Sequence, residues 1–380
     1  MYANVVIVKI QVIKLFGDKK MYKAAIIGFG GMGKWHADAI KEQVSDIQVK
    51  GIYDLRVDAQ QEAKEKGLVI YSNAKEIFDD STIDIVIIAT PNDSHKQYIL
   101  DALANGKHVI CEKPVVLHSA DLKDVIKVAN TSKGLFTIHQ NRRWDQDFQI
   151  VKTILAQEDV GQPYFIESRV NGSSVFLHGW RDYQINGGGM LYDWGVHLID
   201  QALQLIPEKV SSVGAHLFNI HSKEVDDNVK IFLTFESGTS VMLEVATNCF
   251  IPSPRWYVSC SNATIRIDDW SCQGKIVQLA DGQALKWEND IVYTAAGPTR
   301  TMAPRPVNTT KTNDLPSILD ARGNVYHHFS SVDIFYHNFI ESIEGREKLN
   351  VTAAEALRVL EVIELAFEAA ENQITKKCNI

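Results

Sequence analysis

The sequence has little of what marks several large protein classes. Its 380 residues contain only five cysteines, and no two of them form a C-x-x-C pair; they are Cys111, Cys249, Cys260, Cys272 and Cys378. This scatter argues against a disulfide framework and is typical of reduced thiols in a cytoplasmic protein. Acidic residues outnumber basic ones by 47 to 39, and the net charge of −8 argues against nucleic acid or an anionic membrane as partner. No apolar run is long enough to span a bilayer.

The remaining composition is that of a globular protein with more than one core. Hydrophobic residues make up 45% of the chain and charged residues 23%. A chain of this length predicts two domains. We expect an N-terminal domain over residues 21–140 and an α+β domain over 141–380, whose final helices are placed to pack back on the first. Residues 1–20 resemble a poor signal peptide, and we interpret them as an upstream extension or an extra edge strand.

A glycine-rich run follows the first convincing strand, residues 23–28. It has the G-x-G-x-x-G pattern and leads into a helix over residues 34–43. Such glycines allow a tight turn, close approach to a pyrophosphate and close helix packing, while the helix N-terminus faces the anion. The residues of this run predicted to bind a dinucleotide are Gly28, Phe29, Gly30, Gly31, Met32 and Gly33.

The next strand ends where a dinucleotide fold places an acid. Asp54 follows residues 48–53 and stands 21 positions after Gly33. A carboxylate here holds the adenosine ribose hydroxyls and repels a 2′-phosphate, which favours NAD. Arg56 is either an exposed charge at a helix start or a partner for that phosphate, so NADP remains an alternative.

Further strands and helices alternate as far as residue 140. Strands are expected over residues 84–90, 107–111 and 135–140, which predicts a doubly wound parallel sheet of six strands. Ligands bind beyond the carboxyl ends of such strands. The side chains at two of these ends, predicted to contact the cofactor, are Thr90, Pro91, Asn92, His95, Glu112 and Lys113.

A second segment with chemical potential covers residues 187–200, GGGMLYDWGVHLID. Asp193 and His197 are four residues apart and therefore share a helix face, so the carboxylate is expected to orient the imidazole as a general base. The same spacing also suits a metal ion, but no third ligand of similar quality is evident, and we predict no metal. A capping acid beside a satisfied core histidine is the structural alternative.

Alternating runs between residues 211 and 267 predict a large, mainly antiparallel open sheet, with a hairpin turn at residues 236–239. Helices are expected over residues 331–345 and 353–372. Residues 281–328 cannot be assigned. An open sheet face is commonly buried against another subunit, which predicts a homodimer or homotetramer formed through this sheet.

These motifs together resemble the Gfo/Idh/MocA family of NAD(P)-dependent oxidoreductases. The resemblance rests on the glycine run, Thr90-Pro91-Asn92 with His95, the Glu112-Lys113-Pro114 strand end and the GGGMLYDWGVH segment, and it covers nearly all of residues 21–375. Residues 139–145, HQNRRWD, resemble the subgroup that includes scyllo-inositol dehydrogenases.

The resemblance implies hydride transfer between a nicotinamide cofactor and a sugar or cyclic-polyol carbon. It implies catalytic roles for Lys113 at the reacting oxygen, His197 as proton carrier and Asp193 beside them. It also implies a cis bond between Lys113 and Pro114. The residues expected to line the polyol pocket with these three are Arg143, Trp180, Arg181 and Tyr183.

Two other functions remain open from the sequence. Some relatives use transient oxidation in NAD-dependent glycoside hydrolysis. A non-catalytic dinucleotide sensor is the other alternative, although a sensor has no need for a proton carrier such as His197.

Overall fold

The computed structural model describes residues 20–280, 291–300, 310–318 and 330–380. The extension expected over residues 1–20 lies outside this part except for Lys20, and so do portions of 281–328. Among the described residues, no helix is both long and apolar enough to cross a membrane.

A six-stranded, wholly parallel sheet forms the N-terminal part, in the order β3-β2-β1-β4-β5-β6. The strand order reverses between β1 and β4, which places a ligand-binding crevice at the carboxyl ends of these two strands. The predicted doubly wound sheet is therefore confirmed. Its strands are β1 (Tyr22–Ile27), β2 (Ile47–Tyr53), β3 (Val69–Ile70), β4 (Ile85–Ile88), β5 (His108–Cys111) and β6 (Phe136–Ile138).

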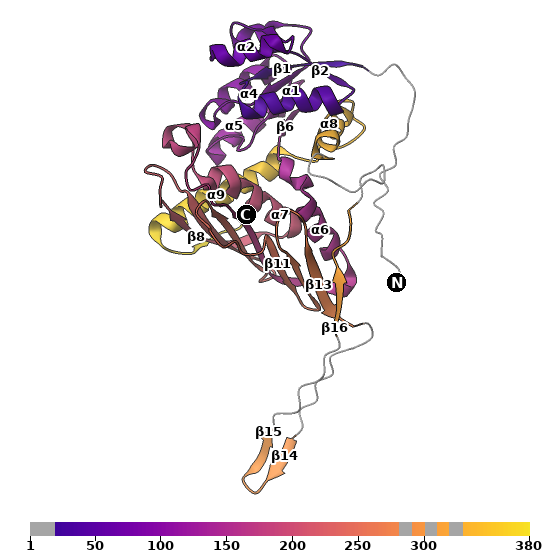
Figure 1. Cartoon of the computed structure of the whole chain (residues 1–380), viewed down its shortest axis with the longest axis vertical. Helices are drawn as coiled ribbons and strands as arrows, with labels where there is room; N and C mark the ends of the chain where they lie inside the picture. The colour runs from indigo at the N-terminus through magenta and orange to yellow at the C-terminus, as the bar shows by residue number, and fades with distance from the viewer. Residues whose placement is uncertain (1–19, 281–290, 301–309, 319–329) are drawn as a thin grey trace.

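Helices pack around this sheet at one end of the molecule (Figure 1). The central strands β1 and β4 bury nearly every side chain, because a sheet covered on both faces has no solvent-facing side. The helices of this part are α1 (Gly31–Gln43), α2 (Val57–Glu65), α3 (Ala74–Asp79), α4 (His95–Ala104) and α5 (Ser119–Ala129).

The second part is built on a nine-stranded sheet in the order β16-β13-β12-β11-β7-β10-β9-β8-β17. Its pairs are antiparallel except for β7 and β10, which run parallel, so the predicted mainly antiparallel sheet is confirmed. The strands are β7 (Pro163–Asn171), β8 (Val210–Phe218), β9 (Asn228–Phe235), β10 (Ser240–Ala246), β11 (Trp256–Cys260), β12 (Ala263–Ile267), β13 (Gly274–Leu279), β16 (Thr310–Asp314) and β17 (Lys376–Lys377). A separate hairpin pairs β14 (Ile291–Thr294) with β15 (Gly297–Arg300).

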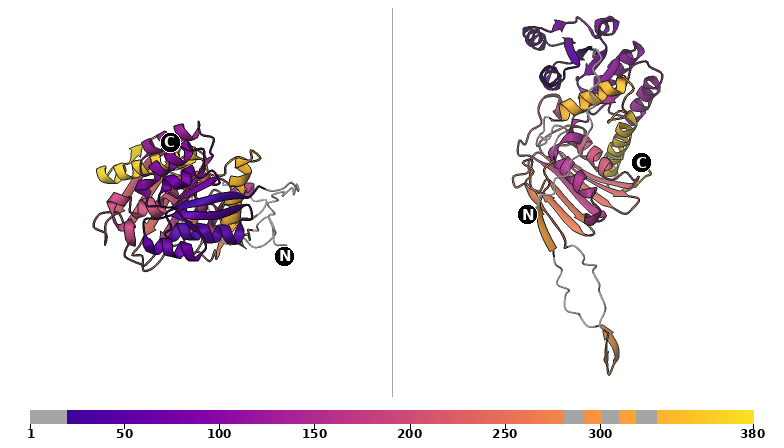
Figure 2. Two further views of the ribbon diagram at one scale, coloured as in Figure 1. Left: turned by 90° about the horizontal axis from the view of Figure 1, so that it is seen from above. Right: turned by 90° about the vertical axis from the view of Figure 1, so that its right-hand side faces the viewer.

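Four longer helices follow the first sheet in the chain: α6 (Gln146–Leu155), α7 (Val196–Leu205), α8 (Ser330–Ile343) and α9 (Ala353–Asn372). Both C-terminal helices also reach the first part of the chain, because α8 contacts α1 and α9 contacts α5. Figure 2 shows the same arrangement from two further directions.

A π-helical turn, η6 (Leu191–Gly195), precedes α7. Met190 separates it from three consecutive glycines, and it carries Asp193. The wider turn therefore lies at the junction between the two sheets, where the candidate site is found.

Candidate active site

The glycine run is shaped by backbone contacts at two positions. Gly28 has φ +89°, and a Cβ there would lie 2.7 Å from the carbonyl oxygen of Ala89. A Cβ on Gly33 would lie 2.0 Å from the carbonyl oxygen of Gly28. These two glycines therefore allow the turn and the close approach of α1 to β1, as the sequence predicts.

Gly30 and Gly31 have the opposite surroundings. No atom lies within 4 Å of where their Cβ atoms would be, and α1 begins at Gly31. Open space beside glycines at a helix N-terminus fits the diphosphate of a dinucleotide. Residues 28–33 thus fit the cofactor that the sequence predicts.

Asp54 is tied to this run. Its Oδ2 accepts a hydrogen bond from the Phe29 N–H at 2.6 Å, and its Oδ1 accepts one from the Arg56 N–H at 2.8 Å. The Arg56 side chain is about half exposed, and its Nη2 lies 3.3 Å from the Phe29 carbonyl oxygen. Asp54 and Arg56, the acid and the base that the sequence predicts to influence the choice between NAD and NADP, therefore stand side by side at the end of β2.

The residues after β4 mostly form hydrogen bonds that hold the local backbone in place. Ser94 donates to the Thr90 hydroxyl at 2.7 Å and to the Pro91 carbonyl at 2.9 Å. Asn92 is buried and donates to the carbonyl of Gly187 at 3.0 Å.

His95 corrects a prediction. It is completely buried, and its ring nitrogens lie 2.9 Å from the Thr90 carbonyl oxygen and 3.0 Å from that of Pro114. The ring joins the end of β4 to the end of β5, so its geometry is that of a backbone brace rather than a cofactor contact.

Glu112 forms the centre of a buried cluster that the sequence did not suggest. Its Oε1 accepts from His36 Nε2 at 2.9 Å and from His139 Nδ1 at 2.8 Å, and its Oε2 accepts from the Lys113 N–H at 3.2 Å. The Tyr336 hydroxyl contacts the other ring nitrogen of His36. Burial opposes ionisation of Glu112, but the two histidines outweigh it and hold the pKa of the carboxyl well below its ordinary value.

The His36, Glu112 and His139 ligand atoms lie within 4.8 Å of one another, a spacing that a metal ion can use. One set of hydrogens accounts for all these contacts: Tyr336 donates to His36, and both imidazoles donate to the carboxylate. The contacts are therefore explained by hydrogen bonding, which holds Glu112 as an anion next to Lys113.

Lys113 joins the two parts of the chain. It follows β5, and its bond to Pro114 is cis, as the resemblance implied. Its Nζ donates to the Asp193 carbonyl oxygen at 2.7 Å and to Asp193 Oδ1 at 3.0 Å. Arg181 Nε donates to the other carboxylate oxygen of Asp193 at 2.9 Å. Burial opposes ionisation of Asp193, but Lys113 and Arg181 together hold the pKa of its carboxyl below the ordinary value.

His197 lies on the first turn of α7. The predicted pair between its imidazole and the Asp193 carboxylate does not form. Both Asp193 oxygens bind cations instead, and the buried Nδ1 of His197 has no hydrogen-bond partner among the described residues. Burial, then the charges of Lys113 and Arg142, hold the pKa of His197 well below its ordinary value. The imidazole is therefore neutral near pH 7 and able to accept a proton.

The three glycines before η6 fix the loop that carries Arg181. The Gly189 N–H donates to the Arg181 carbonyl at 3.0 Å, and the Gly188 N–H donates to the Tyr183 carbonyl at 3.1 Å. A Cβ on Gly188 would lie 2.3 Å from the Arg181 carbonyl oxygen. Glycine is thus required here by the packed loop, beyond the close helix start that the sequence suggested.

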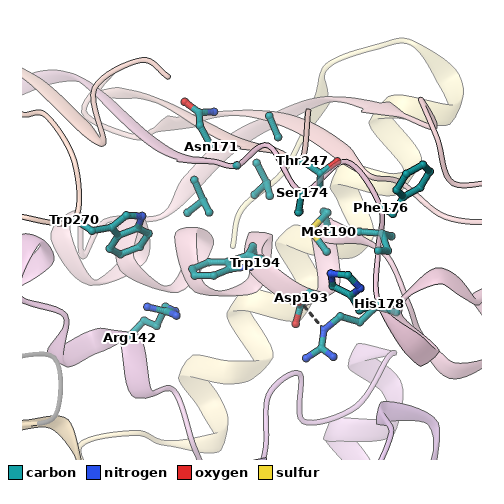
Figure 3. A pocket seen from close by; sticks show the side chains of 16 residues that line it. Arg142, Asn171, Ser174, Phe176, His178, Met190, Asp193, Trp194, Thr247 and Trp270 are labelled. Carbon is teal, nitrogen blue, oxygen red and sulfur yellow. Dashed lines mark hydrogen bonds and ion pairs between the residues drawn. The ribbon is translucent and has the colours of Figure 1, made fainter. Parts of the chain in front are cut away.

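A cavity of about 660 Å³ opens beside Asp193 (Figure 3). Its wall includes Arg142, His178, Arg181, Trp194 and Trp270. The dashed line in Figure 3 marks the ion pair between Asp193 and Arg181. Neither Lys113 nor His197 is part of this wall. Lys113 contacts the wall through Asp193, and His197 is only 4% exposed.

The prediction for Arg143 is also corrected. Its Nε and Nη2 donate to the two carboxylate oxygens of buried Asp200 at 2.8 and 2.6 Å, and its Nη1 donates to the Asn350 carbonyl at 2.7 Å. These bonds join the segment after β6 to α7 and to the start of α9. Arg143 therefore lies outside the cavity wall.

Trp180 and Tyr183, also predicted to line the pocket, are not in the wall either. The Trp180 ring instead supports Arg181, whose Cζ lies 4.7 Å from the ring centroid. Tyr183 is mostly exposed and contributes its backbone to the loop.

Three residues of the wall were not predicted from the sequence: Arg142, Trp194 and Trp270. The Arg142 Cζ lies 4.1 Å from the Trp194 ring centroid and 5.5 Å from that of Trp270. Trp194 stands beside Asp193 in the sequence and could have been selected from that position. Trp270, after β12, carries no such signal because only the fold brings it to this site.

Comparisons with known proteins agree with this geometry. A family model described as an oxidoreductase family with an NAD-binding Rossmann fold matches residues 22–140. A second model, the GFO/IDH/MocA C-terminal domain, matches residues 148–266. The two matches together cover more than half of the chain.

Curated relatives include an uncharacterized oxidoreductase of Schizosaccharomyces pombe, which is 30% identical over 56% of this chain and 60% of its own length. The chain thus matches only about three fifths of that protein. The scyllo-inositol 2-dehydrogenase (NADP(+)) IolW of Bacillus subtilis is 26% identical over 93% of this chain and 95% of its own.

Among solved structures, an NAD-binding protein from Listeria innocua is 38% identical, with a TM-score of 0.81 over 94% of this chain and 97% of that one. Both family models, this structural likeness and the shared site motifs lead to one conclusion: the chain belongs to the Gfo/Idh/MocA family of oxidoreductases, with an NAD-binding Rossmann fold in its N-terminal part.

Proposed function

We propose that this chain is an NAD(P)-dependent dehydrogenase acting on a CH–OH group of a sugar or cyclic polyol. The observation that carries the proposal is the contact of Lys113, at the end of a nucleotide-sheet strand, with Asp193 in the wall of the cavity. This contact joins a cation at the end of a nucleotide-sheet strand to a carboxylate of the cavity wall, which supports a role for Lys113 at the reacting oxygen. The full-length relative IolW, which acts on scyllo-inositol, supports the polyol class.

The nicotinamide, when bound, supplies the acceptor for the hydride that leaves the substrate carbon. The Lys113 ammonium stabilises negative charge that develops on the substrate oxygen. Neutral His197 accepts the hydroxyl proton after the bound substrate has displaced the groups that cover the buried imidazole ring. Asp193 holds Lys113 and Arg181 in fixed positions. The products are a carbonyl compound, the reduced cofactor and one proton.

Residues 28–33, Asp54 and Arg56 are the residues that we assign to the cofactor. Asp54 favours NAD, whereas the half-exposed Arg56 beside it is available to a 2′-phosphate. Parallel measurements of KM for NAD and NADP, in the intact chain and in Arg56→Ala, decide this question. A selective rise in KM for NADP would assign Arg56 to the phosphate.

Lys113→Met tests the central assignment. The substitution keeps the length of the side chain but removes the charge, so we expect turnover to fall at least about 1,000-fold because transition-state charge is left unstabilised. Cofactor binding, followed by calorimetry, is expected to change little. Turnover of a panel of sugars and inositols is followed by the absorbance of the reduced cofactor.

Undiminished turnover in Lys113→Met would refute the role of Lys113. Release of an aglycone from glycosides, with no net cofactor reduction on free polyols, would instead establish the hydrolase alternative. Tight cofactor binding without turnover of any substrate would support the sensor.

A further inference from the structure

We infer that the substrate carries a carboxylate and that Arg181 binds it, so that the favoured substrates are hydroxylated acids such as sugar acids. This inference deepens the proposed function and rests on it for the identity of the reacting hydroxyl. It goes beyond the neutral polyols to which the proposed function would otherwise extend.

The Arg181 guanidinium is only partly used by the protein. Its Nε donates to Asp193, while its two terminal nitrogens have no hydrogen-bond partner among the described residues. The side chain is 35% exposed and belongs to the cavity wall. Arg181 therefore presents two parallel N–H donors to whatever occupies the cavity, which is the geometry that a carboxylate fits.

The charged groups of the wall also favour an anion. Two of them are guanidinium groups and one is a carboxylate, Asp193, which already gives an oxygen to Lys113 and the other to Arg181. Arg142 is matched separately, because its Nη1 donates to Asp145 at 2.8 Å. Lys113 and Arg181 thus share the carboxylate of Asp193, and Arg181 has no other acid within ion-pair distance among the described residues.

Neighbouring acids do not pair with the terminal nitrogens of Arg181. Asp182, next to Arg181, forms no ion pair among the described residues and is not in the cavity wall. Glu112 precedes Lys113, but its carboxylate is buried against His36 and His139 and is also outside the wall. The described part of the chain therefore leaves the terminal N–H groups of Arg181 to be paired by an acidic group of the ligand.

Arg181 is also held in place before any ligand binds. Its guanidinium lies over Trp180, and its backbone carbonyl accepts the Gly189 N–H in the tightly packed turn at Gly188. A preorganised guanidinium loses little freedom on binding, which increases its affinity for a planar anion. A hydroxyl would satisfy only one of the two donors.

The reaction itself is unchanged by this group. The C–H bond of the hydroxyl-bearing carbon breaks with its electron pair passing to the oxidised cofactor, and the O–H proton passes to His197. The carboxylate is neither formed nor consumed. Its contribution is to position that carbon.

The test compares acids with their neutral counterparts, galacturonate with galactose and glucuronate with glucose, on the full chain with NAD and with NADP. We expect kcat/KM to be at least about tenfold higher for the acid of a pair. In Arg181→Gln, kcat/KM for the acid is expected to fall about 30- to 100-fold, mostly through KM, because a charge-assisted pair is lost. The fall for the neutral sugar is expected to stay below about fivefold, and Arg181→Lys should lie between the two.

Arg346→Gln is the matched control, since this arginine is half exposed and pairs with Glu341 on the surface. It is expected to leave both substrates unaffected. Equal kcat/KM for acid and neutral sugar, or an equal loss for both in Arg181→Gln, would overturn the inference while the dehydrogenase proposal stands.

Calorimetric binding in the presence of oxidised cofactor separates the two proposals if no substrate turns over. Binding of the acids that is lost in Arg181→Gln supports the carboxylate site even then. Acids that bind no better than neutral sugars overturn it.

Discussion

Arg142 and Arg143 are adjacent in the chain but have opposite environments. Arg142 faces the cavity between two tryptophans, whereas Arg143 is buried in a bidentate ion pair with Asp200. A buried pair contributes little compared with apolar packing, but breaking one leaves an uncompensated buried charge. We therefore expect Arg143 to matter for stability rather than for substrate binding.

Arg143→Met is expected to lower the free energy of unfolding by about 3 to 5 kcal/mol, because Asp200 loses its partner. Urea unfolding measures this loss. Arg346→Gln, which removes a surface pair, should cost less than about 1 kcal/mol. The double variant Arg143→Met/Asp200→Leu should recover part of the loss. If the single variant were as stable as the control while KM rose, Arg143 would be a substrate residue after all.

His197 makes a prediction about pH. Burial and nearby cations hold its pKa well below 6.5, so the imidazole stays neutral, and able to accept a proton, as the pH falls through 6.5. The rate of substrate oxidation should then change less than about twofold between about pH 7.5 and pH 6, whereas an ordinary histidine would reduce it about fourfold. A profile of kcat/KM against pH measures this. An acid limb centred at 6.5 or above would contradict the role assigned to this ring.

The sequence predicted several of these residues from local patterns. The strand end at Glu112-Lys113-Pro114 singled out Lys113, which contacts Asp193 in the second part of the chain. The spacing of Asp193 and His197 predicted a pair that does not form, because Lys113 and Arg181 are stronger partners for the carboxylate than a neutral ring. Such competition between distant residues leaves no mark in local spacing.

At the scale of elements, the turn η6 depends on an acid from the segment before β9. Asp226 Oδ2 accepts the Leu191 N–H at 2.7 Å, and the backbone at Gly189 is too close to Asp226 Oδ1 for any side chain there. Burial raises the pKa of the Asp226 carboxyl to about 7. The packing at the start of η6, the turn that carries Asp193, therefore depends on the protonation state of Asp226 and so on pH.

The sign of that link follows from the raised pKa. A carboxyl whose pKa is higher in the folded than in the unfolded protein contributes stability that is present below 3.8 and lost as the pH rises through about 7. Asp226→Asn keeps an acceptor for Leu191 but cannot ionise. Between about pH 4 and pH 7 the free energy of unfolding of the unmodified chain should fall relative to this variant, by at most about 4 kcal/mol. Parallel urea titrations at several pH values test this, and identical slopes against pH would exclude the linkage.

Most elements of the fold were predictable because their buried residues form continuous apolar runs or follow the period of a helix. The buried strands β1, β4 and β5 stand out as apolar runs, and α9 was placed correctly at residues 353–372. β3, β13, β16 and β17 were missed. Their residues are polar or half exposed, so pairing with neighbouring strands rather than a buried face defines them.

At the scale of the whole molecule, the nine-stranded sheet carries exposed aromatic side chains. Phe218 on β8 and Phe232 on β9 are each at least 40% exposed, and both rings contact His216. Apolar groups on an open sheet face suit contact with a second copy of the chain, and a two-fold interface would use each residue twice.

Phe232→Asp should therefore convert a dimer or tetramer into single chains, since each interface would bury two unpaired carboxylates. Light scattering after size exclusion gives the mass, and circular dichroism confirms that the variant is folded. An unmodified chain that elutes as a monomer would contradict this prediction. So would a variant that remains assembled.

The hydrogen-bond chain around Glu112 also bears on whether the two parts of the chain can fold or be exchanged separately. Its members are contributed by α1, the ends of β5 and β6, and α8, so the first and last thirds of the sequence complete one buried polar network. A gene fragment ending near residue 140 would encode every strand of the nucleotide sheet but would lack Tyr336 and the helix that covers α1. We therefore expect that a fragment ending between the two family-model matches, at residues 140 to 148, does not fold independently. Exchanging one half of the chain for that of a relative would need matched residues at both ends of the chain.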